Sequence, residues 1–488
     1  MIKTSPMGSS PSAGLPVAPP ANTGQSRGTA APPTAPLKEK ASLIMMAVTC
    51  LLIFNHFGRP FEYVLVGWRI PAVICSIGIV LVFVGGYLKL FHSRAGLPLL
   101  LLVAWMVIST PFSSWRAGSA VYLQTYIQFW IVLFLMIAGS PKSTKDLTLI
   151  AALVGLSSVF HILIGGSSSS VDGRFELSGS SYGNADDVAL LAGFAIPFVI
   201  LVASGFKNRL LRYPALLGGV GYLMLTAGRT ATRAAIPAMI LMMAVYFLRG
   251  RGGQKLAVVF FLIVAVVGAI FALPDSTFER LASLGNSFGL ADVESAARSG
   301  GGLSEADASL LERRKLVQDA IMMTLEHPLF GVGPGEFVDF RTKALEGTGD
   351  KSHNLPSHNT YLQVASELGF GGIILYLWFL GSLYASIRYV RKTNRAHLHP
   401  QWQLISQMVL AIEAAFVYFA VCAAFMTCDR HPQQFVLAGI LVALERMLAS
   451  VALQPGKAVL SPGVRFAGGS GAGMKRVGPG KTLPVPGF

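Results

Sequence analysis

The segment LPSHNTYLQVASELGFGG begins an otherwise apolar stretch with polar side chains. Three of its polar residues are spaced four apart and therefore share one face of a helix: Asn359, Gln363 and Glu367. His358 precedes this face at the expected helix N-terminus, with Ser357 as the expected N-cap. The partial positive charge of a helix N-terminus favours a neutral imidazole, the form that accepts a proton near pH 7. His358 is therefore predicted to be a general base or, alternatively, a helix-capping residue at the membrane interface.

Two pairs of arginines could bind an anion. Arg229 and Arg233 are four residues apart in LTAGRTATRAA, between two apolar segments. Two guanidinium groups there suit a pyrophosphate, through bidentate charge-assisted hydrogen bonds. The alternative is that these long side chains reach lipid headgroups at the helix ends. Arg313 and Arg314 are adjacent in SLLERRKLVQDAIMMTLE, where ordinary charge on a helix surface is the alternative to a binding role.

Two more segments carry candidate chemistry. Arg174 precedes an apolar run whose first turn contains Asp186 and Asp187. Acidic residues at a helix start are ordinary partners of the helix dipole, although paired aspartates also bind metals together with substrate phosphates. FGVGPGEF, residues 330–337, predicts a tight turn. Its backbone N–H groups could cradle a phosphate, but it lacks the lysine of a P-loop.

The elements that position these residues are predicted to be membrane helices. The chain has 488 residues, of which 53% are hydrophobic and only 13% are charged. A soluble domain has about a quarter of charged residues, so the composition indicates an all-α polytopic membrane protein. We interpret the net charge of +15 as a topology signal and not as a sign of nucleic-acid binding. The four cysteines form no metal-binding spacing.

About twelve apolar runs approach the roughly 20 residues that span a bilayer. They are predicted near 41–57, 64–88, 97–112, 119–139, 146–165, 185–205, 212–228, 231–248, 256–273, 360–387, 403–426 and 432–450. Lys and Arg gather in every second connector, so both termini are expected in the cytoplasm.

This pattern divides the chain into five parts. They are a disordered cytoplasmic tail (1–40), a bundle of about nine transmembrane helices (41–273), a large periplasmic loop with short helices (274–357), about three further transmembrane helices (358–450) and a second disordered tail (451–488). Within the loop, residues 309–326 predict an amphipathic helix. Its expected apolar stripe consists of Leu310, Val317, Ile321 and Met322.

Two motifs in combination resemble the O-antigen ligase and polymerase superfamily: HPLFGVGPGEF, residues 327–337, and SHNTYLQVASELGFGG, residues 357–372. The resemblance covers roughly residues 100–450. It implies a metal-independent glycosyltransferase without cofactors, similar to C-type enzymes with lipid-linked donors, on the periplasmic side of the bacterial inner membrane. The donor would be a glycan on undecaprenyl pyrophosphate. The acceptor would be lipid A core for a ligase, or another glycan for a polymerase of O-antigen or exopolysaccharide.

The resemblance also implies roles for single residues. His358 would accept the proton of the acceptor hydroxyl, and displacement would invert the anomeric carbon. Arg233 fits the donor-binding arginine slightly better than Arg229, and both stay candidates. The loop arginine matches Arg313 or Arg314, and Arg174 is a weaker third candidate on the donor side. A lipid-linked glycan flippase or another polysaccharide transporter is the alternative function.

Overall fold

The structure is a computed structural model that describes residues 35–63, 68–165, 167–169, 174–177, 182–272, 305–346, 354–396 and 399–452. Residues Ser42–Phe488 form one compact unit, and Met1–Ala41 form another. The tails predicted as disordered lie almost wholly outside the described residues, as do the loop residues 273–304 and 347–353. The domain boundaries expected from the sequence therefore stay predictions.

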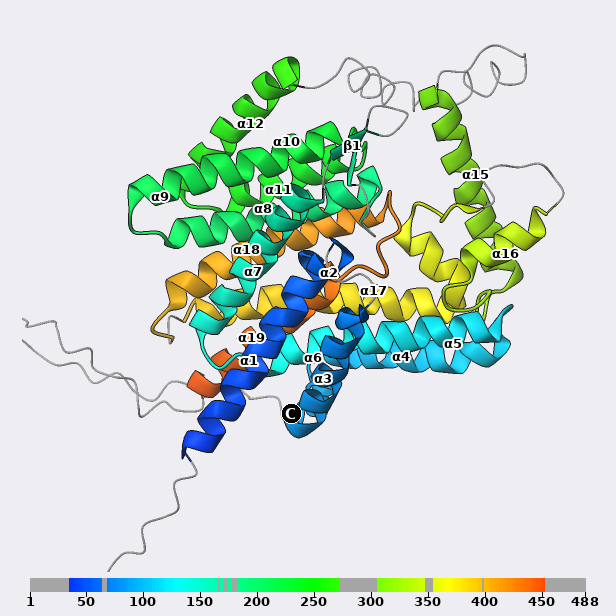
Figure 1. Cartoon of the computed structure of the whole chain (residues 1–488), viewed down its shortest axis with the longest axis horizontal. Coiled ribbons are helices and arrows are strands. Elements are labelled where there is room, and N and C mark those ends of the chain that lie inside the picture. The colour runs from blue at the N-terminus through cyan, green and yellow to red at the C-terminus, as the bar shows by residue number, and fades with distance from the viewer. Residues whose placement is uncertain are drawn as a thin grey trace, which may run out of the picture. The chain divides into compact units, whose positions relative to one another are not determined.

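The described residues fold almost entirely into helices (Figure 1). The α-helices are α1 (Ala35–Phe57), α2 (Pro60–Tyr63), α3 (Ile70–Val84), α4 (Gly96–Ser109), α5 (Arg116–Thr125), α6 (Val132–Gly139), α7 (Thr144–Ile164), α8 (Ala185–Gly205), α9 (Arg209–Pro214), α10 (Gly221–Arg229), α11 (Ala235–Arg249), α12 (Gly252–Ala272), α15 (Glu305–Glu326), α16 (Phe337–Ala344), α17 (Thr360–Asn394), α18 (Trp402–Ala423) and α19 (Gln433–Ala452). One small antiparallel hairpin, β1 (Ser167–Ser169) with β2 (Phe175–Leu177), was not predicted.

Seven helical segments in the described part of the chain are long and apolar enough to cross a membrane. Two of them are continuous through a π-helical turn: Arg116–Gly139, which joins α5 to α6, and Arg209–Arg229, which joins α9 to α10. Five shorter apolar helices lie at the remaining predicted spans. The chain is therefore an all-α polytopic membrane protein, while twelve crossings stay a prediction.

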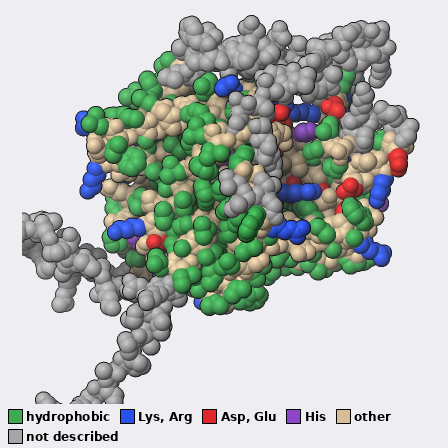
Figure 2. Space-filling model, viewed as in Figure 1, with side chains coloured by type: hydrophobic (Ala, Val, Ile, Leu, Met, Phe, Trp, Pro, Cys, Tyr) green, Lys and Arg blue, Asp and Glu red, His purple; other side chains and the backbone are tan. Residues whose placement is uncertain are grey.

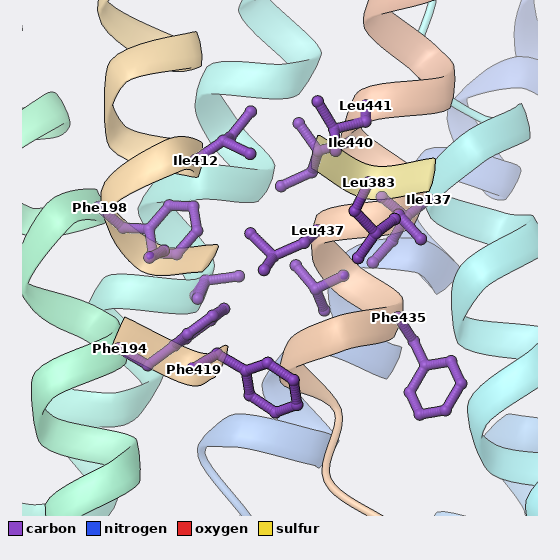
Figure 3. Close-up of a cluster of buried hydrophobic side chains, with 14 of the residues drawn as sticks. Ile137, Phe194, Phe198, Leu383, Ile412, Phe419, Phe435, Leu437, Ile440 and Leu441 are labelled. Carbon is purple, nitrogen blue, oxygen red and sulfur yellow. The ribbon is translucent and has the colours of Figure 1, made fainter. Parts of the chain in front are cut away.

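The buried core extends over most of the helices, and Figure 3 shows the part in which α18 packs between α8 and α19. Phe194 and Phe198 of α8 lie near Phe419 of α18 and Leu437 of α19, and all four side chains are fully buried. Small residues let these helices approach closely, as is common in membranes. A Cβ atom on Gly193 would lie 2.0 Å from the ring of Tyr418, so α8 and α18 need glycine at this contact.

Helix α17 is broken at Gly369, where φ is +67°. A break frees carbonyl groups that a continuous helix would pair internally. The backbone N–H groups of Val332 and Gly333 donate to the carbonyls of Ser366 and Glu367, at 2.9 and 3.0 Å. The indole N–H of Trp105 donates to the carbonyl of Leu368 at 2.9 Å. The glycine-rich turn therefore completes the hydrogen bonding of α17, which favours the structural interpretation over a phosphate cradle.

The apolar stripe predicted for the loop helix is correct only in part. Val317 of α15 is half-buried, whereas Ile321 and Met322 are 42% and 53% exposed, and the side chain of Leu310 lies outside the described ones. The buried side chains of the described part of α15 are Leu316, Ala320, Met323 and Thr324, which share one helix face. Ala320 and Met323 pack with Val332 and Phe337 of the turn, so a tertiary contact selects this neighbouring face.

Candidate active site

The carboxylate of Asp186 is the centre of the polar cluster around His358. Arg174 Nη2 lies 2.7 Å from Asp186 Oδ1, and Arg313 Nη2 lies 3.2 Å from Asp186 Oδ2. The hydroxyl of Thr232 donates to Asp186 Oδ1 at 2.9 Å. His358 Nδ1 lies 3.9 Å from Asp186 Oδ2. Figure 2 shows a hollow on this face of the molecule around which Lys or Arg, Asp or Glu, and His side chains gather.

The start of α8 turns Asp186 inward. Asn184 is the N-cap of this helix, and its side chain accepts from the N–H of Asp187 at 2.8 Å. Asn184 therefore does the capping, and Asp186 forms ion pairs with two arginines. Asp186 and Asp187 lie in the first turn of α8, as predicted, and the structure adds the two arginine partners of Asp186.

The side chain of Arg174 is held by three residues from two elements. Besides Asp186, its Nη2 donates to Thr232 Oγ1 at 3.0 Å, and its Nε donates to the carbonyl of Thr230 at 2.9 Å. Thr230 and Thr232 belong to the turn between α10 and α11. Arg174, the weakest donor-side candidate in the sequence, thus links the segment before β2 to this turn and to α8.

His358 has a left-handed backbone with φ of +51°, which is uncommon for a residue other than glycine. Such conformations persist where the surrounding structure enforces them, and they cluster at functional sites. Asn359, and not Ser357, is the N-cap of α17, since its side chain accepts from the N–H of Leu362 at 3.1 Å. The prediction that Ser357 is the N-cap and the alternative that His358 caps the helix are therefore wrong. The hydroxyl of Ser357 instead contacts the backbone of Asn359.

The imidazole of His358 is held in its neutral form. The pKa of His358 is lowered to about 4, mainly by burial and also by the charges of Arg313 and Arg174, while the charge of Asp186 opposes this shift. The sequence predicted a neutral histidine from the helix dipole, whereas the structure attributes it mainly to burial and to arginine. A neutral imidazole has one ring nitrogen available as an acceptor.

The polar face of α17 connects the His358 segment to the glycine-rich turn. Gln363 Oε1 accepts from the backbone N–H of Ser357 at 3.0 Å, and Gln363 Nε2 donates to Glu367 Oε1 at 2.5 Å. Glu367 Oε2 accepts from the N–H of Gly335 at 2.8 Å. The side-chain amide of Asn359 also donates to the carbonyl of Ala424 at 2.9 Å. These side chains hydrogen-bond to backbone groups and to one another, which supports the start of α17.

The remaining candidate arginines lie beside this cluster in different ways. The guanidinium carbon of Arg229 lies 5.1 Å from the ring centre of Phe175, and Arg229 is exposed. Arg233 is half-buried and follows Thr232 directly. Arg314 is half-buried and follows Arg313 on α15. The structure thus brings Arg174, Arg313 and His358 together around Asp186.

A second polar cluster was missed in the sequence. His431 Nε2 lies 3.6 Å from Asp187 Oδ1, and the His431 ring meets the edge of Tyr182 at 5.2 Å. The guanidinium carbon of Arg59 lies 4.2 Å from the Tyr182 ring centre. Burial and nearby arginine charge lower the pKa of His431 to about 3. The sequence feature that could have indicated this cluster is the polar segment CDRHPQQ, which lies between two apolar runs.

The charges of the first cluster favour an anion. Two arginines oppose one carboxylate next to a neutral imidazole, which leaves one net positive charge among these four partly buried side chains. Within the described residues, no group of three or more His, Cys, Asp or Glu side chains is arranged to hold a metal ion. The arrangement can bind a phosphate-bearing group and accept a proton beside it.

Comparison with known proteins identifies one domain. Residues 214–377 match the family model of O-Antigen ligase, which is about a third of the 488 residues. The matched range includes both candidate arginine pairs and His358, but not Arg174 or Asp186. No curated protein matches the chain. The match confirms the resemblance to the O-antigen ligase and polymerase superfamily that the two motifs indicate.

Proposed function

We propose, from the premise that residues 214–377 form an O-antigen ligase domain, that the protein moves a glycan from undecaprenyl pyrophosphate to an acceptor hydroxyl. The reaction takes place on the periplasmic face of the bacterial inner membrane. The observation that carries the proposal is the position of His358 beside Asp186, which Arg174 and Arg313 flank. A site that combines a base with two anion-binding groups suits transfer from a pyrophosphate donor.

The proposed step is a single displacement. Nε2 of His358 accepts the proton of the acceptor hydroxyl while that oxygen attacks the anomeric carbon of the donor sugar. The bond between this carbon and the pyrophosphate oxygen breaks, and the anomeric configuration inverts. Undecaprenyl pyrophosphate leaves with the electron pair, and Arg174 and Arg313 stabilise the developing charge. Asp186 Oδ2 lies 3.9 Å from Nδ1 of His358, and its negative charge favours a proton on Nδ1, which leaves Nε2 as the acceptor.

Donor binding makes His358 a better base. Without donor, burial is the main cause of the low pKa of His358, about 4, and the charges of Arg313 and Arg174 contribute to it. A pyrophosphate beside these arginines offsets their charge, so the pKa of His358 rises toward the pH of the reaction. Proton transfer is most efficient when the pKa of the base lies near that pH. The site therefore becomes competent once the donor is in place.

The remaining parts of the proposal concern substrates. Arginine supplies the positive charge at the leaving group, so the proposed step uses no metal ion or other cofactor. Lipid A core is the acceptor if the protein is a ligase, and a second lipid-linked glycan is the acceptor if it is a polymerase. Arg229 and Arg233 stay candidates for further donor contacts, whereas of the loop pair Arg313 is preferred over Arg314 because Arg313 contacts Asp186.

A transfer assay on the purified full chain tests this function. The protein is given an undecaprenyl-pyrophosphate glycan, alone or with lipid A core, with and without divalent metal. Longer lipid-linked chains from donor alone identify a polymerase, and glycan on lipid A core identifies a ligase. No consumption of donor in any mixture would contradict glycosyl transfer and favour the transporter alternative.

The first variant to compare is His358→Ala. Loss of the base is expected to reduce transfer by about 100-fold or more, since general base catalysis contributes roughly 10²–10⁴-fold. His399→Ala is the matched control, because His399 lies in the connector between α17 and α18, at the other end of α17. Both variants should insert into the membrane normally. Wild-type transfer by the His358→Ala protein would exclude His358 as the base.

A further inference from the structure

A second hollow lies at the C-terminal end of α17, at the other end of the helix from His358. It is a cavity of about 800 Å³ between the ends of α11 and α17 and the residues before α4. Its lining contains six basic side chains: Arg94, Arg249, Arg388, Arg391, Lys392 and Arg395. No part of the proposed transfer reaction uses this cavity.

The basic side chains of the cavity outnumber the carboxylates that pair with them. Glu413 of α18 pairs with Arg391 and lies 3.2 Å from Nε of Arg249. Glu445 of α19 lies 3.6 Å from Nε of Arg94. Six positive charges against two negative ones leave a surplus of four. Such a concentration of like charge is unfavourable unless an anion is bound there.

Three of these basic residues have no structural partner in the described part of the chain. Arg388, Lys392 and Arg395 are exposed, and no ion pair with a described carboxylate is formed by any of them. They occupy the last turns of α17 and the residue after it. Cations are favourable at a helix C-terminus, but that effect does not require them to line a cavity.

The surroundings of the cavity indicate that its ligand is a lipid. The two neighbouring helices expose large apolar side chains: Leu97 and Leu101 of α4, and Leu377 and Trp378 of α17. The guanidinium of Arg94 also lies 4.5 Å from the ring centre of Tyr389, an arrangement typical of an interface between apolar and polar surroundings. Acyl chains can lie along such apolar surfaces while a headgroup occupies the basic hollow. Basic pockets between membrane helices on the cytoplasmic side bind acidic headgroups.

We propose that this cavity binds the phosphate of an anionic phospholipid from the cytoplasmic leaflet. Arg388 and Arg395 donate charge-assisted hydrogen bonds to the phosphate oxygens, and Lys392 adds a positive charge. Arg249 and Arg391 stay paired with Glu413 and form the inner wall. The bound headgroup links the ends of α17 and α11 and stabilises their packing against α4 and α18.

Native mass spectrometry of the purified full chain in detergent measures the affinity for phosphatidylglycerol. The test variant is R388Q/K392Q/R395Q, and the matched control is K207Q/R209Q/R212Q. The control removes three exposed basic side chains from the connector before α9 and its first turns, which belong to the same predicted side of the membrane. The test variant should bind at least about tenfold more weakly, because one charge-assisted hydrogen bond is worth about that factor. The control should bind like the wild type.

Competitors identify the source of the phosphate. Phosphatidylcholine and inorganic phosphate should displace phosphatidylglycerol poorly, because the first has no net charge and the second has no acyl chains. Equal weakening in the control variant would overturn the proposal and indicate non-specific attraction to basic connectors. Displacement by inorganic phosphate at equal concentration would overturn it in favour of a soluble anion. If the triple variant does not fold, R388Q and R395Q are measured singly, and wild-type binding by both would overturn the proposal.

Discussion

The carboxylate of Asp186 holds three functional groups of the candidate site in place. Arg174 and Arg313 come from segments far apart in the chain, and each places a guanidinium on a different oxygen of Asp186. Without a donor, Asp186 partly neutralises these arginines and keeps them aligned. A pyrophosphate with more negative charge can then bind beside groups that are already in position, which reduces the cost of ordering them.

A comparison of two adjacent arginines tests this arrangement. Arg313→Gln should lower the rate of transfer by about 100-fold, since removing one group that stabilises developing charge costs roughly 10²–10³. Arg314→Gln should keep most of the rate, because consecutive helix residues point in directions about 100° apart and Arg313 is the one that contacts Asp186. Transfer rates of the two purified variants decide this, and equal losses would contradict a special role for Arg313.

The pH dependence of transfer tests the assignment of the base. Protonated His358 cannot accept a proton, so the rate should fall as the pH drops through the pKa of His358. In the free enzyme this pKa is about 4, which kcat/KM should report. With donor bound the pKa is expected to be higher, so kcat should begin to fall at a higher pH than kcat/KM.

Arg313→Gln serves as the control for this pH profile. Removing a positive charge near the imidazole should raise the pKa of His358 and move the acid limb of kcat/KM to higher pH. If the acid limb of kcat/KM lies at the same pH in Arg313→Gln as in the wild type, a group other than His358 titrates.

At the scale of elements, the broken helix α17 and the glycine-rich turn form one unit. The turn donates backbone hydrogen bonds to α17 at the break, and the Glu367 side chain of α17 accepts another from the N–H of Gly335. Gln363 extends this connection to the backbone of Ser357, next to His358. The two motifs that indicate the resemblance to O-antigen ligases thus form one support next to His358, the proposed base.

Gly331→Ala is expected to disrupt this unit. Gly331 has φ of +68°, and a Cβ atom there would lie 2.3 Å from the carbonyl carbon of Glu367. The strained backbone alone costs about 1–3 kcal/mol, and the clash adds to it. Gly381→Ala in α17 is the control, since a Cβ atom there meets nothing within 4 Å. Thermal unfolding should show a lower midpoint for Gly331→Ala only, and a wild-type midpoint would contradict the close contact.

At the scale of the whole molecule, α17 connects two sites that differ in chemistry. Its N-terminal end follows His358, and its C-terminal end lines the basic cavity. If α17 crosses the membrane, the proposed transfer site and the proposed lipid site face opposite sides of the bilayer. The orientation of the chain therefore decides whether the donor glycan can reach His358.

Cysteine labelling in intact spheroplasts tests this orientation. Glu346→Cys places a thiol on an exposed residue after α16, and Lys207→Cys places one on an exposed residue before α9. A membrane-impermeant maleimide should label Cys at 346 from outside, and Cys at 207 only after permeabilisation. Three native cysteines are buried and Cys50 is half-buried, so the background should be low. Labelling of position 207 alone in intact cells would reverse the predicted topology.

Local sequence patterns determined much of this protein. Apolar runs of membrane length predicted helices that the structure places at the same positions, because the hydrophobicity of a segment is a property of its own residues. The four-residue spacing of Gln363 and Glu367 predicted their common face for the same reason. The two motifs around the glycine turn and His358 sufficed to indicate the family.

Only the tertiary structure decided which polar residues meet. The sequence did not predict that Arg174 and Arg313 both pair with Asp186. It also did not predict that Asn359 is the N-cap of α17, or which face of α15 is buried. Each depends on how helices far apart in the sequence pack together. The spacing of residues along a helix determines which side chains share a face. Which other helix covers that face, and which charged side chain lies next to it, depends on the packing of the whole bundle.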